Sequence, residues 1–244
     1  MKIIKPANID PSKITISKIS SFSMGPNECK KIEIRYDGQP FYLMGPKMFS
    51  PFGLCQYPKP EDVRANTKVK YHLQMNFKGE KDGFEKFPTI ETLYNACVDI
   101  DFHMVELLLK ESGNFLNEET TERSIIDNMY NRVIQKANKE EYDSYFKMKM
   151  PTEYNSPGKF KPTSFSKSDK NKPLDPNVER IREFMSTRKW VKPVFLFDCL
   201  FYINGKIYPS IEAYQLKIYD EEEKENTEKT KTTKVVKKKK SKLI

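Results

Sequence analysis

The feature that most constrains this chain is a long apolar hairpin between Lys189 and Ile218. Asn204-Gly205 lies near its centre, and this dipeptide accepts the positive φ angles that a two-residue hairpin turn requires. The first arm, Val194 to Ile203, is an almost unbroken apolar run, which predicts a strand buried on both faces. The sequence therefore predicts two paired strands, of which the first lies inside the protein.

Positive charge is concentrated in one internal segment. The 244 residues contain 43 Lys and Arg and 34 Asp and Glu, a formal net charge of +9. Residues 147–192 have 12 basic against 5 acidic residues, whereas residues 1–146 have 20 against 21. Residues 220–244 have 9 against 6. A basic excess confined to one segment and to the tail indicates a local surface that attracts polyanions.

Further stretches show the period-two alternation of β-strands. Lys31–Tyr36 and Gln39–Met44 flank the turn dipeptide Asp37-Gly38, which predicts a second hairpin. Val69–Phe77 alternates strictly between apolar and polar residues, the pattern of a half-buried strand. Tyr145–Met150 is a further expected strand, and its two lysines are expected to point away from the core.

The spacing of apolar residues becomes helical between these strands. From Thr89 to Leu108 they recur every three or four positions, and a second stripe runs from Ile125 to Ala137. The two stripes predict an antiparallel helical pair, inserted at about residues 88–141. A shorter helix is expected from Asn177 to Thr187.

Two segments are too broken by Pro and Gly for regular structure, namely Gly45–Leu54 and the basic, Pro-rich segment at about 151–177. We expect loops there. Residues 220–244 run from acidic to basic with almost no apolar side chains, so we expect a disordered tail. The hairpins, the alternating strand and the helical insertion together predict an α+β, β-rich fold. Its core would be a single OB-fold-like barrel over residues 1–219.

No motif of a common catalytic or cofactor site is present. The chain has no phosphate-binding glycine loop, no dinucleotide fingerprint and no zinc-protease motif. Its two histidines, His72 and His103, are expected on the surface. Asp99 and Asp101 stand two residues apart on a helix and therefore point to different faces. We expect no enzymatic activity, no metal and no cofactor.

The cysteines and the apolar runs indicate the compartment. No two cysteines form a Cys-x-x-Cys pair, and each lies in or near an apolar stretch, where a reduced thiol behaves as a small hydrophobic residue. The run at 193–203 is too short to span a bilayer and contains Asp198, and no signal peptide is found. We expect a soluble, intracellular protein of a reducing compartment, without a membrane partner. The cysteines are Cys29, Cys55, Cys97 and Cys199.

Aromatic and basic residues interleave in and around the basic segment. Sequence-tolerant binding of a single strand needs cations for phosphates and rings for bases, and stacking contributes about 1–3 kcal/mol per base. The pattern therefore predicts binding of single-stranded DNA, with RNA left open. A core position for Trp190 or Phe184, and plain solvation of the lysines, are the structural alternatives. The expected binding residues are Lys47, Phe49, Phe52, Tyr145, Lys147, Lys149, Tyr154, Lys159, Phe160, Lys161, Phe165, Lys167, Arg188, Lys189 and Trp190.

Three landmarks resemble a known family: Gly45–Leu54, the following strand Lys70–Phe77, and Gly205–Ser210. They are similar to landmarks of the OB-fold single-stranded-DNA-binding proteins of large nucleocytoplasmic DNA viruses, over roughly residues 10–219. The resemblance implies non-enzymatic coating and protection of single strands in viral DNA replication, repair or recombination. It also implies a host cytoplasmic (viral factory) or nuclear location, packaging in the virion and self-association along the strand as options. Many such proteins end in an acidic tail, whereas here lysines follow the acidic run Asp220–Glu228.

A second hypothesis, from another class, is a structural or virion-assembly protein. In that case Gly45–Leu54 and the hairpins would make protein–protein contacts, and the basic segment would be a solvated surface. Self-association without nucleic acid would favour it. A nuclease is a distant third hypothesis, which metal-dependent turnover would revive. The lysine run Lys237–Lys240 fits either phosphate contacts or nuclear localisation, and the sequence does not separate the two.

Overall fold

The structure is a computed structural model that describes residues 1–24, 27–64, 68–116, 120–154, 156–161, 164–167 and 172–219. The predicted tail, residues 220–244, lies outside the described residues. The strands are β1 (Ile3–Ile4), β2 (Ile14–Met24), β3 (Asn27–Tyr36), β4 (Phe41–Met44), β5 (Met48–Ser50), β6 (Leu54–Tyr57), β7 (Lys70–Asn76), β8 (Tyr145–Met150), β9 (Thr152–Glu153), β10 (Ser156–Phe160), β11 (Ser164–Lys167), β12 (Lys172–Pro173), β13 (Lys189–Ile203) and β14 (Lys206–Tyr219). The helices are α1 (Pro88–Lys110), α2 (Ser112–Phe115), α3 (Arg123–Met129) and α4 (Val178–Phe184), with 3-10 turns at Pro6–Asn8, Pro11–Lys13, Pro60–Asp62 and Glu80–Asp82.

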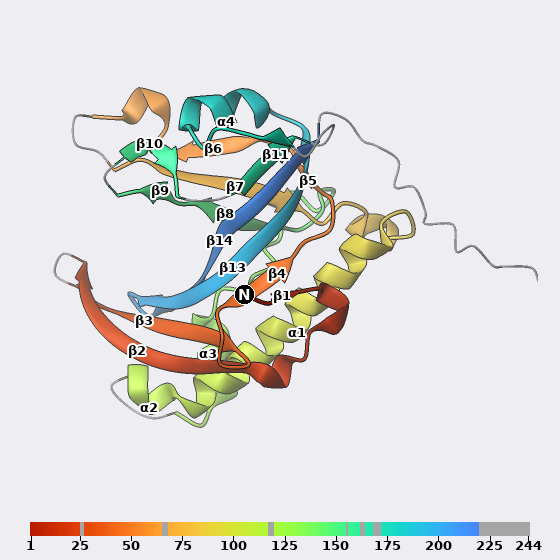
Figure 1. Ribbon diagram of the computed structural model, residues 1–244. Coiled ribbons are helices and arrows are strands. Elements are labelled where there is room, and N and C mark those ends of the chain that lie inside the picture. The colour runs from red at the N-terminus through yellow and green to blue at the C-terminus, as the bar shows by residue number, and fades with distance from the viewer. Residues whose placement is uncertain are drawn as a thin grey trace, which may run out of the picture.

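Five strands close into a barrel (Figure 1). In the order β5, β7, β8, β14 and β13, each strand pairs with the next, and β13 pairs back with β5. All of these pairings are antiparallel except β8 with β14, which is parallel. A small five-stranded barrel is the architecture of the OB fold. The predicted β-rich, OB-fold-like class with a helical insertion is therefore confirmed.

Alternate residues of the barrel strands fill its interior. Leu73 and Met75 on β7 are fully buried, and Phe146 and Met148 on β8 are at most 1% exposed. The Phe146 ring packs 5.3 Å from the ring of Phe195 on β13, and the core continues from there to the apolar face of α1. Each such side chain contributes about 1.5–3 kcal/mol by burial. The residues that alternate with these on β7 and β8 consequently face away from the core.

The predicted C-terminal hairpin is formed by β13 and β14. Asn204 has φ of 50° and Gly205 has φ of 74°, and Ile203 pairs with Lys206 across a two-residue turn. This is the geometry that the Asn-Gly dipeptide favours. The 15-residue strand β13 also pairs with β3, β4 and β5 along its length. It therefore belongs both to the barrel and to the N-terminal sheet (Figure 1).

The second predicted hairpin does not form as expected. Asp37 and Gly38 do adopt positive φ angles, of 52° and 72°, and the residues on either side of them form a bridge. However, β3 pairs with β2 and β13, while β4 pairs with β1 and β13. The two strands lie one after the other along the same edge of β13, at the pairs Cys199–Glu33 and Phe197–Phe41. The long β13 offers each of them a run of backbone partners, and the turn only loops out between them.

Strands replace parts of the two predicted loops. Met48–Ser50 is β5, because its backbone pairs with β13 and β7 to close the barrel. Within 151–177, β9 pairs with β10, and β11 pairs in parallel with β14. These partners are mostly distant in the sequence, so local composition does not reveal them. The prediction of irregular structure was wrong at these strands.

The second predicted helix is shorter than expected. Helix α3 ends at Met129, and the chain then turns to β14, where the Asn131 N–H donates to the carbonyl of Ile207 at 2.8 Å. The buried Asp101 carboxylate on α1 accepts the Tyr130 hydroxyl at 2.7 Å and the Val133 N–H at 3.0 Å. These partners satisfy polar groups that a longer helix would have paired internally. The Asp101 carboxylate thus holds the end of the insertion against α1, and the Asn131 backbone joins it to the barrel hairpin.

Replacing this carboxylate should change how stability depends on pH. Burial raises the pKa of Asp101 from 3.8 to about 6, although the bonds from Val133 and Tyr130 oppose the shift. The native state therefore keeps a proton that the unfolded chain has released, and stability falls as the pH rises through this range. Relative to Asp101→Asn, we expect the wild type to lose about 3 kcal/mol of unfolding free energy between about pH 4 and pH 7. Urea unfolding of both proteins at several pH values measures this difference. The control Asp99→Asn, at an exposed position, should show the pH dependence of the wild type. If the unfolding free energy of Asp101→Asn changed with pH as that of the wild type does, the raised pKa of Asp101 would be contradicted.

Candidate nucleic-acid interface

The outward side chains of β7 and β8 form a polar surface on the barrel. Cross-strand register places His72 opposite Lys149, Gln74 opposite Lys147 and Asn76 opposite Tyr145. Directly opposite residues lie on the same face, with Cβ atoms about 5 Å apart. Because their neighbours in sequence fill the core, these side chains point outward. Lys147 and Lys149 are exposed, as the sequence predicted.

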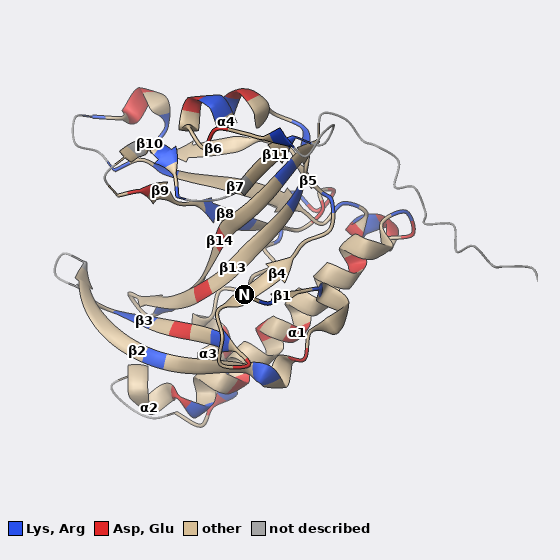
Figure 2. Ribbon diagram, viewed as in Figure 1, with Lys and Arg blue, Asp and Glu red and all other residues tan. Residues whose placement is uncertain are grey.

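Strand β6 extends this surface along the edge of β7 that lies opposite β8. Cys55 pairs with His72 and Tyr57 with Lys70, and the Tyr57 side chain is 68% exposed. Figure 2 shows the basic residues on β8. The surface, which we call the β6–β8 face, consists of nine described residues, none of which is acidic: Cys55, Tyr57, Lys70, His72, Gln74, Asn76, Tyr145, Lys147 and Lys149.

Lys149 connects this face to the β13–β14 hairpin. Its ammonium donates to Ser210 Oγ at 2.9 Å and lies 4.9 Å from the ring centroid of Phe201. The side chain as a whole is exposed, but partial burial of its ammonium lowers its pKa, an effect that Glu212 opposes and Lys70 supports. The two strands of the hairpin thus supply a ring, from Phe201 on β13, and a hydroxyl, from Ser210 on β14, next to the lysines of the face.

His72 adds an uncharged ring at neutral pH. Its pKa is lowered from 6.5, mainly because the imidazole is partly buried and also because Lys147 lies nearby. A lowered pKa leaves the imidazole neutral at pH 7. The positive charge of the β6–β8 face at that pH therefore comes from Lys70, Lys147 and Lys149.

This arrangement has the parts that single-strand binding uses. In OB folds, the face of the second and third barrel strands binds oligonucleotides. Here β7 and β8 are the second and third barrel strands in chain order. Lysines attract phosphates, and exposed rings offer flat surfaces on which any base can stack. Tyr57 and Tyr145 are the two tyrosines of this face, and the Lys147 ammonium lies 5.9 Å from the ring centroid of Tyr145.

The other predicted residues lie elsewhere. Tyr154 is 95% exposed, and Lys159 and Lys161 are exposed beside β10. Phe52 is 58% exposed in the loop before β6, and Arg188, whose N–H donates to Pro51 O at 3.0 Å, is exposed next to that loop. A further group of predicted residues, on β5, β13 and the segment just before β5, comprises Lys47, Phe49, Lys189 and Trp190. The structure therefore divides the predicted set among several surfaces.

Three of the predicted rings are in the core. Phe160 is 0%, Phe165 is 3% and Trp190 is 6% exposed. Phe160 packs edge-on against Tyr71 at 5.5 Å and against Phe165 at 5.8 Å, while Phe87 stacks on Trp190 at 6.1 Å. A base cannot reach these ring faces without displacing packed side chains. Their predicted stacking role is corrected to a structural one.

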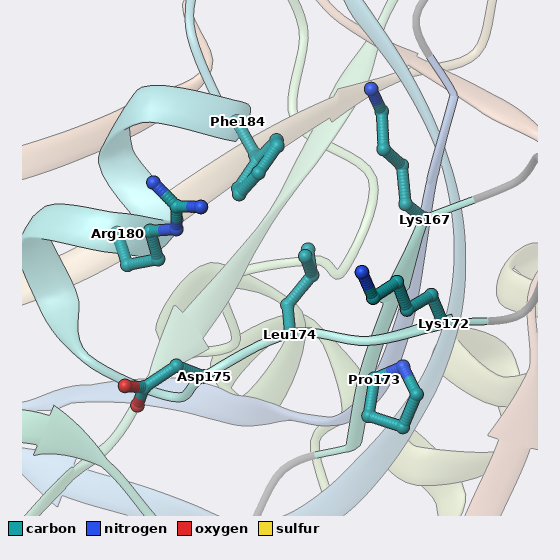
Figure 3. Close-up of a pocket in the computed structure, with 7 residues that line it drawn as sticks. All are labelled: Lys167, Lys172, Pro173, Leu174, Asp175, Arg180 and Phe184. Carbon is teal, nitrogen blue, oxygen red and sulfur yellow. The ribbon is translucent and has the colours of Figure 1, made fainter.

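Lys167 lines a hollow between α4 and the β11–β12 hairpin (Figure 3). The hollow has a volume of about 460 Å³. Lys167 lies 5.7 Å, and the Arg180 guanidinium 5.1 Å, from the ring centroid of Phe184, which is partly exposed. Lys167 thus belongs to this hollow and is not one of the residues of the β6–β8 face.

Within the described parts of the chain, no helix is long and apolar enough to cross a membrane. Among the same residues, no group of three or more His, Cys, Asp and Glu side chains is placed to hold a metal ion. All four cysteines are free thiols. Burial strongly raises the pKa of Cys97, and it raises that of Cys199 to about 12, so both thiols are protonated at neutral pH.

Sequence reasoning missed much of the β6–β8 face. Tyr57 was not singled out, and Lys70, Gln74 and Asn76 were seen only as the polar half of an alternating strand. The strict alternation of Val69–Phe77 was a usable signal, because it places these residues on one outward face. What the pattern did not show is that β8 lies beside β7, so that the two polar faces combine.

No protein-family model matches the chain, and no curated protein matches it. Among solved structures, the single-stranded DNA-binding protein from bacteriophage Enc34 is similar, with 10% identity and a TM-score of 0.39 over 91% of this chain and 98% of that chain. A C-terminal truncation of the same phage protein has 11% identity and a TM-score of 0.39, over 88% of this chain and 98% of that chain. With TM-scores below 0.5, these similarities do not bear on the activity of this chain.

Proposed function

We propose that this protein is a non-enzymatic single-stranded DNA-binding protein that uses the β6–β8 face. The observation that carries the proposal is the composition of this face, where three lysines and two accessible tyrosines occur without a carboxylate among the nine described residues. Lys70, Lys147 and Lys149 contact phosphates, and Tyr57 and Tyr145 stack on bases. Because every base has a flat face, such binding tolerates any sequence.

Preference for a single strand follows from the rings. Bases in a duplex are stacked on one another and offer no free face, so Tyr57 and Tyr145 contribute only when the bases are unpaired. The lysines contact the phosphates of either form. Discrimination against duplex therefore rests on the two tyrosines, and overall attraction rests on the lysines.

The biological role that we propose is coating and protection of single strands in the replication, repair or recombination of a large DNA virus genome. The resemblance of Gly45–Leu54, Lys70–Phe77 and Gly205–Ser210 to the viral family supports this role. It would place the protein in the cytoplasm or nucleus of an infected cell. RNA binding is an outcome that the experiment below distinguishes.

A competition titration tests the proposal. Labelled single-stranded DNA is titrated with the full chain at two salt concentrations, with unlabelled duplex DNA and RNA as competitors. We expect salt-sensitive binding for which duplex competes poorly. No binding, or equal competition by duplex, would overturn the proposal.

The contribution of the lysines can be measured from the salt dependence. Each phosphate contact on a single strand contributes a slope of about −0.7 in log affinity against log salt. We expect Lys147→Gln/Lys149→Gln to reduce the magnitude of the slope by about 1.4. The matched control is Lys2→Gln/Lys110→Gln, which removes two exposed lysines from the N-terminus and the end of α1. An equal change in the control would show that only net charge matters.

A further inference from the structure

A row of side chains crosses the outside of the barrel from the β6–β8 face to β14. Tyr145 pairs with Asn76, Asn76 with Phe49, Phe49 with Trp190, and Trp190 with Tyr219. All four pairings are antiparallel, so the five side chains share the outer face. With strands about 4.8 Å apart, the row follows a curved path of about 19 Å around the barrel, and Phe87 covers the buried Trp190 within it. It leads from the proposed binding face onto β5, β13 and β14.

Lysines gather at the far end of this row. The Lys78 ammonium lies 4.9 Å from the Trp190 ring centroid, and Lys47 lies 5.6 Å from the same ring. Lys47 and Lys217 lie 4.6 and 5.5 Å from the centroid of Tyr219. The rings hold the ammonium groups in place by cation–π attraction. We define the lysine–aromatic cluster as Lys47, Phe49, Lys78, Phe87, Trp190, Lys192, Lys217 and Tyr219.

Two members of the cluster repel one another. Lys192 and Lys217 stand directly opposite on β13 and β14. Like charges in this position destabilise a sheet. The ligand that matches several close ammonium groups is a chain of negative charges.

We propose that the lysine–aromatic cluster is a second phosphate-binding track, which holds the same single strand after it leaves the β6–β8 face. This inference rests on the proposed function. The β6–β8 face supplies the rings for stacking, whereas the ring faces of the cluster are occupied by lysines and neighbouring rings. The cluster therefore contacts the backbone of the strand and not its bases.

Continuity favours nucleic acid as the occupant. The cluster shares the row with Tyr145, and Lys78, two residues after Asn76, lies 5.5 Å from the ring centroid of Phe49 in the same row. A strand lying on Tyr145 and Lys147 can pass over Asn76 and reach Lys78 without crossing a described carboxylate of the row. An acidic protein segment would match the charge of the cluster, but it has no bases to stack on Tyr145 at the other end of the row.

Oligonucleotides of different length distinguish binding to the β6–β8 face from binding to the lysine–aromatic cluster, because a short one reaches only the β6–β8 face. Single OB folds cover about 4–16 nucleotides, so oligonucleotides at the two ends of this range are titrated with the full chain. We expect Lys192→Gln/Lys217→Gln to bind the short oligonucleotide as the wild type does. Loss of two phosphate contacts lowers affinity for the long one by about 25-fold at 0.1 M salt, through a slope change of about 1.4. The effect should fade towards 1 M salt.

Stability and a charge-matched variant complete the test. The unfolding temperature of Lys192→Gln/Lys217→Gln is measured beside the binding, and only a loss of affinity by a variant that is fully folded at the temperature of the titration counts as support. Lys2→Gln/Lys110→Gln should leave binding to both lengths unchanged. Equal losses for the short and long oligonucleotides, or no loss for either, would overturn the track. The track would also be overturned if Lys192→Gln/Lys217→Gln weakened binding only in a chain without residues 220–244. In that case the acidic run Asp220–Glu228, and not DNA, would occupy the cluster in the full chain. Failure of the proposed function would give a different result, because the wild type would then bind neither the short nor the long oligonucleotide.

Discussion

Single-stranded DNA should bind at least about thirtyfold more weakly to Tyr57→Ala/Tyr145→Ala than to the wild type. Stacking on one ring contributes about 1–3 kcal/mol, so two rings contribute about 2–6 kcal/mol, and 1.4 kcal/mol is a factor of ten in Kd. Tyr57 is 68% exposed, and Tyr145 is partly exposed on the same face. Fluorescence anisotropy titration of a labelled oligonucleotide measures the loss. Duplex affinity should change much less, because duplex bases are not free to stack.

Two controls make this result specific. Tyr57→Phe/Tyr145→Phe keeps both rings and should retain the affinity of the wild type. Phe102→Ala removes a 59% exposed ring on α1, with the Arg123 guanidinium 4.4 Å from its centroid. This control has the same chemistry, an exposed ring beside a cation, on a different surface. A comparable loss in Phe102→Ala, or no loss in the double alanine variant, would contradict stacking on the β6–β8 face.

Phe160→Ala should lower the free energy of unfolding by about 3–5 kcal/mol, the usual cost of removing a buried phenyl ring. Phe160 is 0% exposed and lies between Tyr71 and Phe165. The folded fraction should nevertheless bind single-stranded DNA as tightly as the wild type, because the ring is not available to a base. Urea unfolding followed by titration below the transition separates the two effects.

Tyr154→Ala is the matched control for this substitution. Tyr154 lies six residues away and is 95% exposed, so its loss should change stability by no more than about 0.5 kcal/mol. If Phe160→Ala does not fold, Phe160→Leu leaves a smaller cavity and keeps the measurement possible. A variant with unchanged stability but weaker DNA binding would show that Phe160 is a binding residue after all.

Local sequence predicted the parts of the fold that depend on local geometry. Asn204-Gly205 joins two long strands that pair with each other, so here the turn dipeptide correctly predicted which strands are neighbours. Asp37-Gly38 carries an equally good turn signal, and the turn forms, but β3 and β4 pair with β13 instead of with each other. Turn chemistry fixes two φ angles. The partner of a strand depends on the competition among all the strands.

The same limit applies to the candidate site. Alternation correctly placed Lys147 and Lys149 outside the core, because it determines which side chains share a face. Phe160 and Trp190 also occur among lysines and prolines, yet both are buried. Whether a ring in a basic segment is covered depends on elements far away in the chain, such as Phe87 for Trp190. Composition alone does not contain this information.

The lysine–aromatic cluster is the part of the molecule that the sequence predicts least well. Lys47, Lys78, Lys192 and Lys217 come from four separate regions of the chain, and no two are close enough in sequence to suggest a site. Only the pairing of β5, β7, β13 and β14 brings them together. The basic excess counted over residues 147–192 includes one of the four. Charge counted along the chain is therefore a poor guide to charge on the surface.

The multiple pairings of β13 also set the order in which the protein can fold as it is synthesised. Strands β3, β4 and β5 each have one of their two partners in β13, which begins at Lys189. At about 5–20 residues per second, a ribosome needs on the order of 10–30 s after making β4 before it has made β13. During that time the N-terminal strands have unpaired edges, which invite pairing with other chains. Newly made copies on one messenger RNA are thus most prone to mispairing just before the last hairpin emerges.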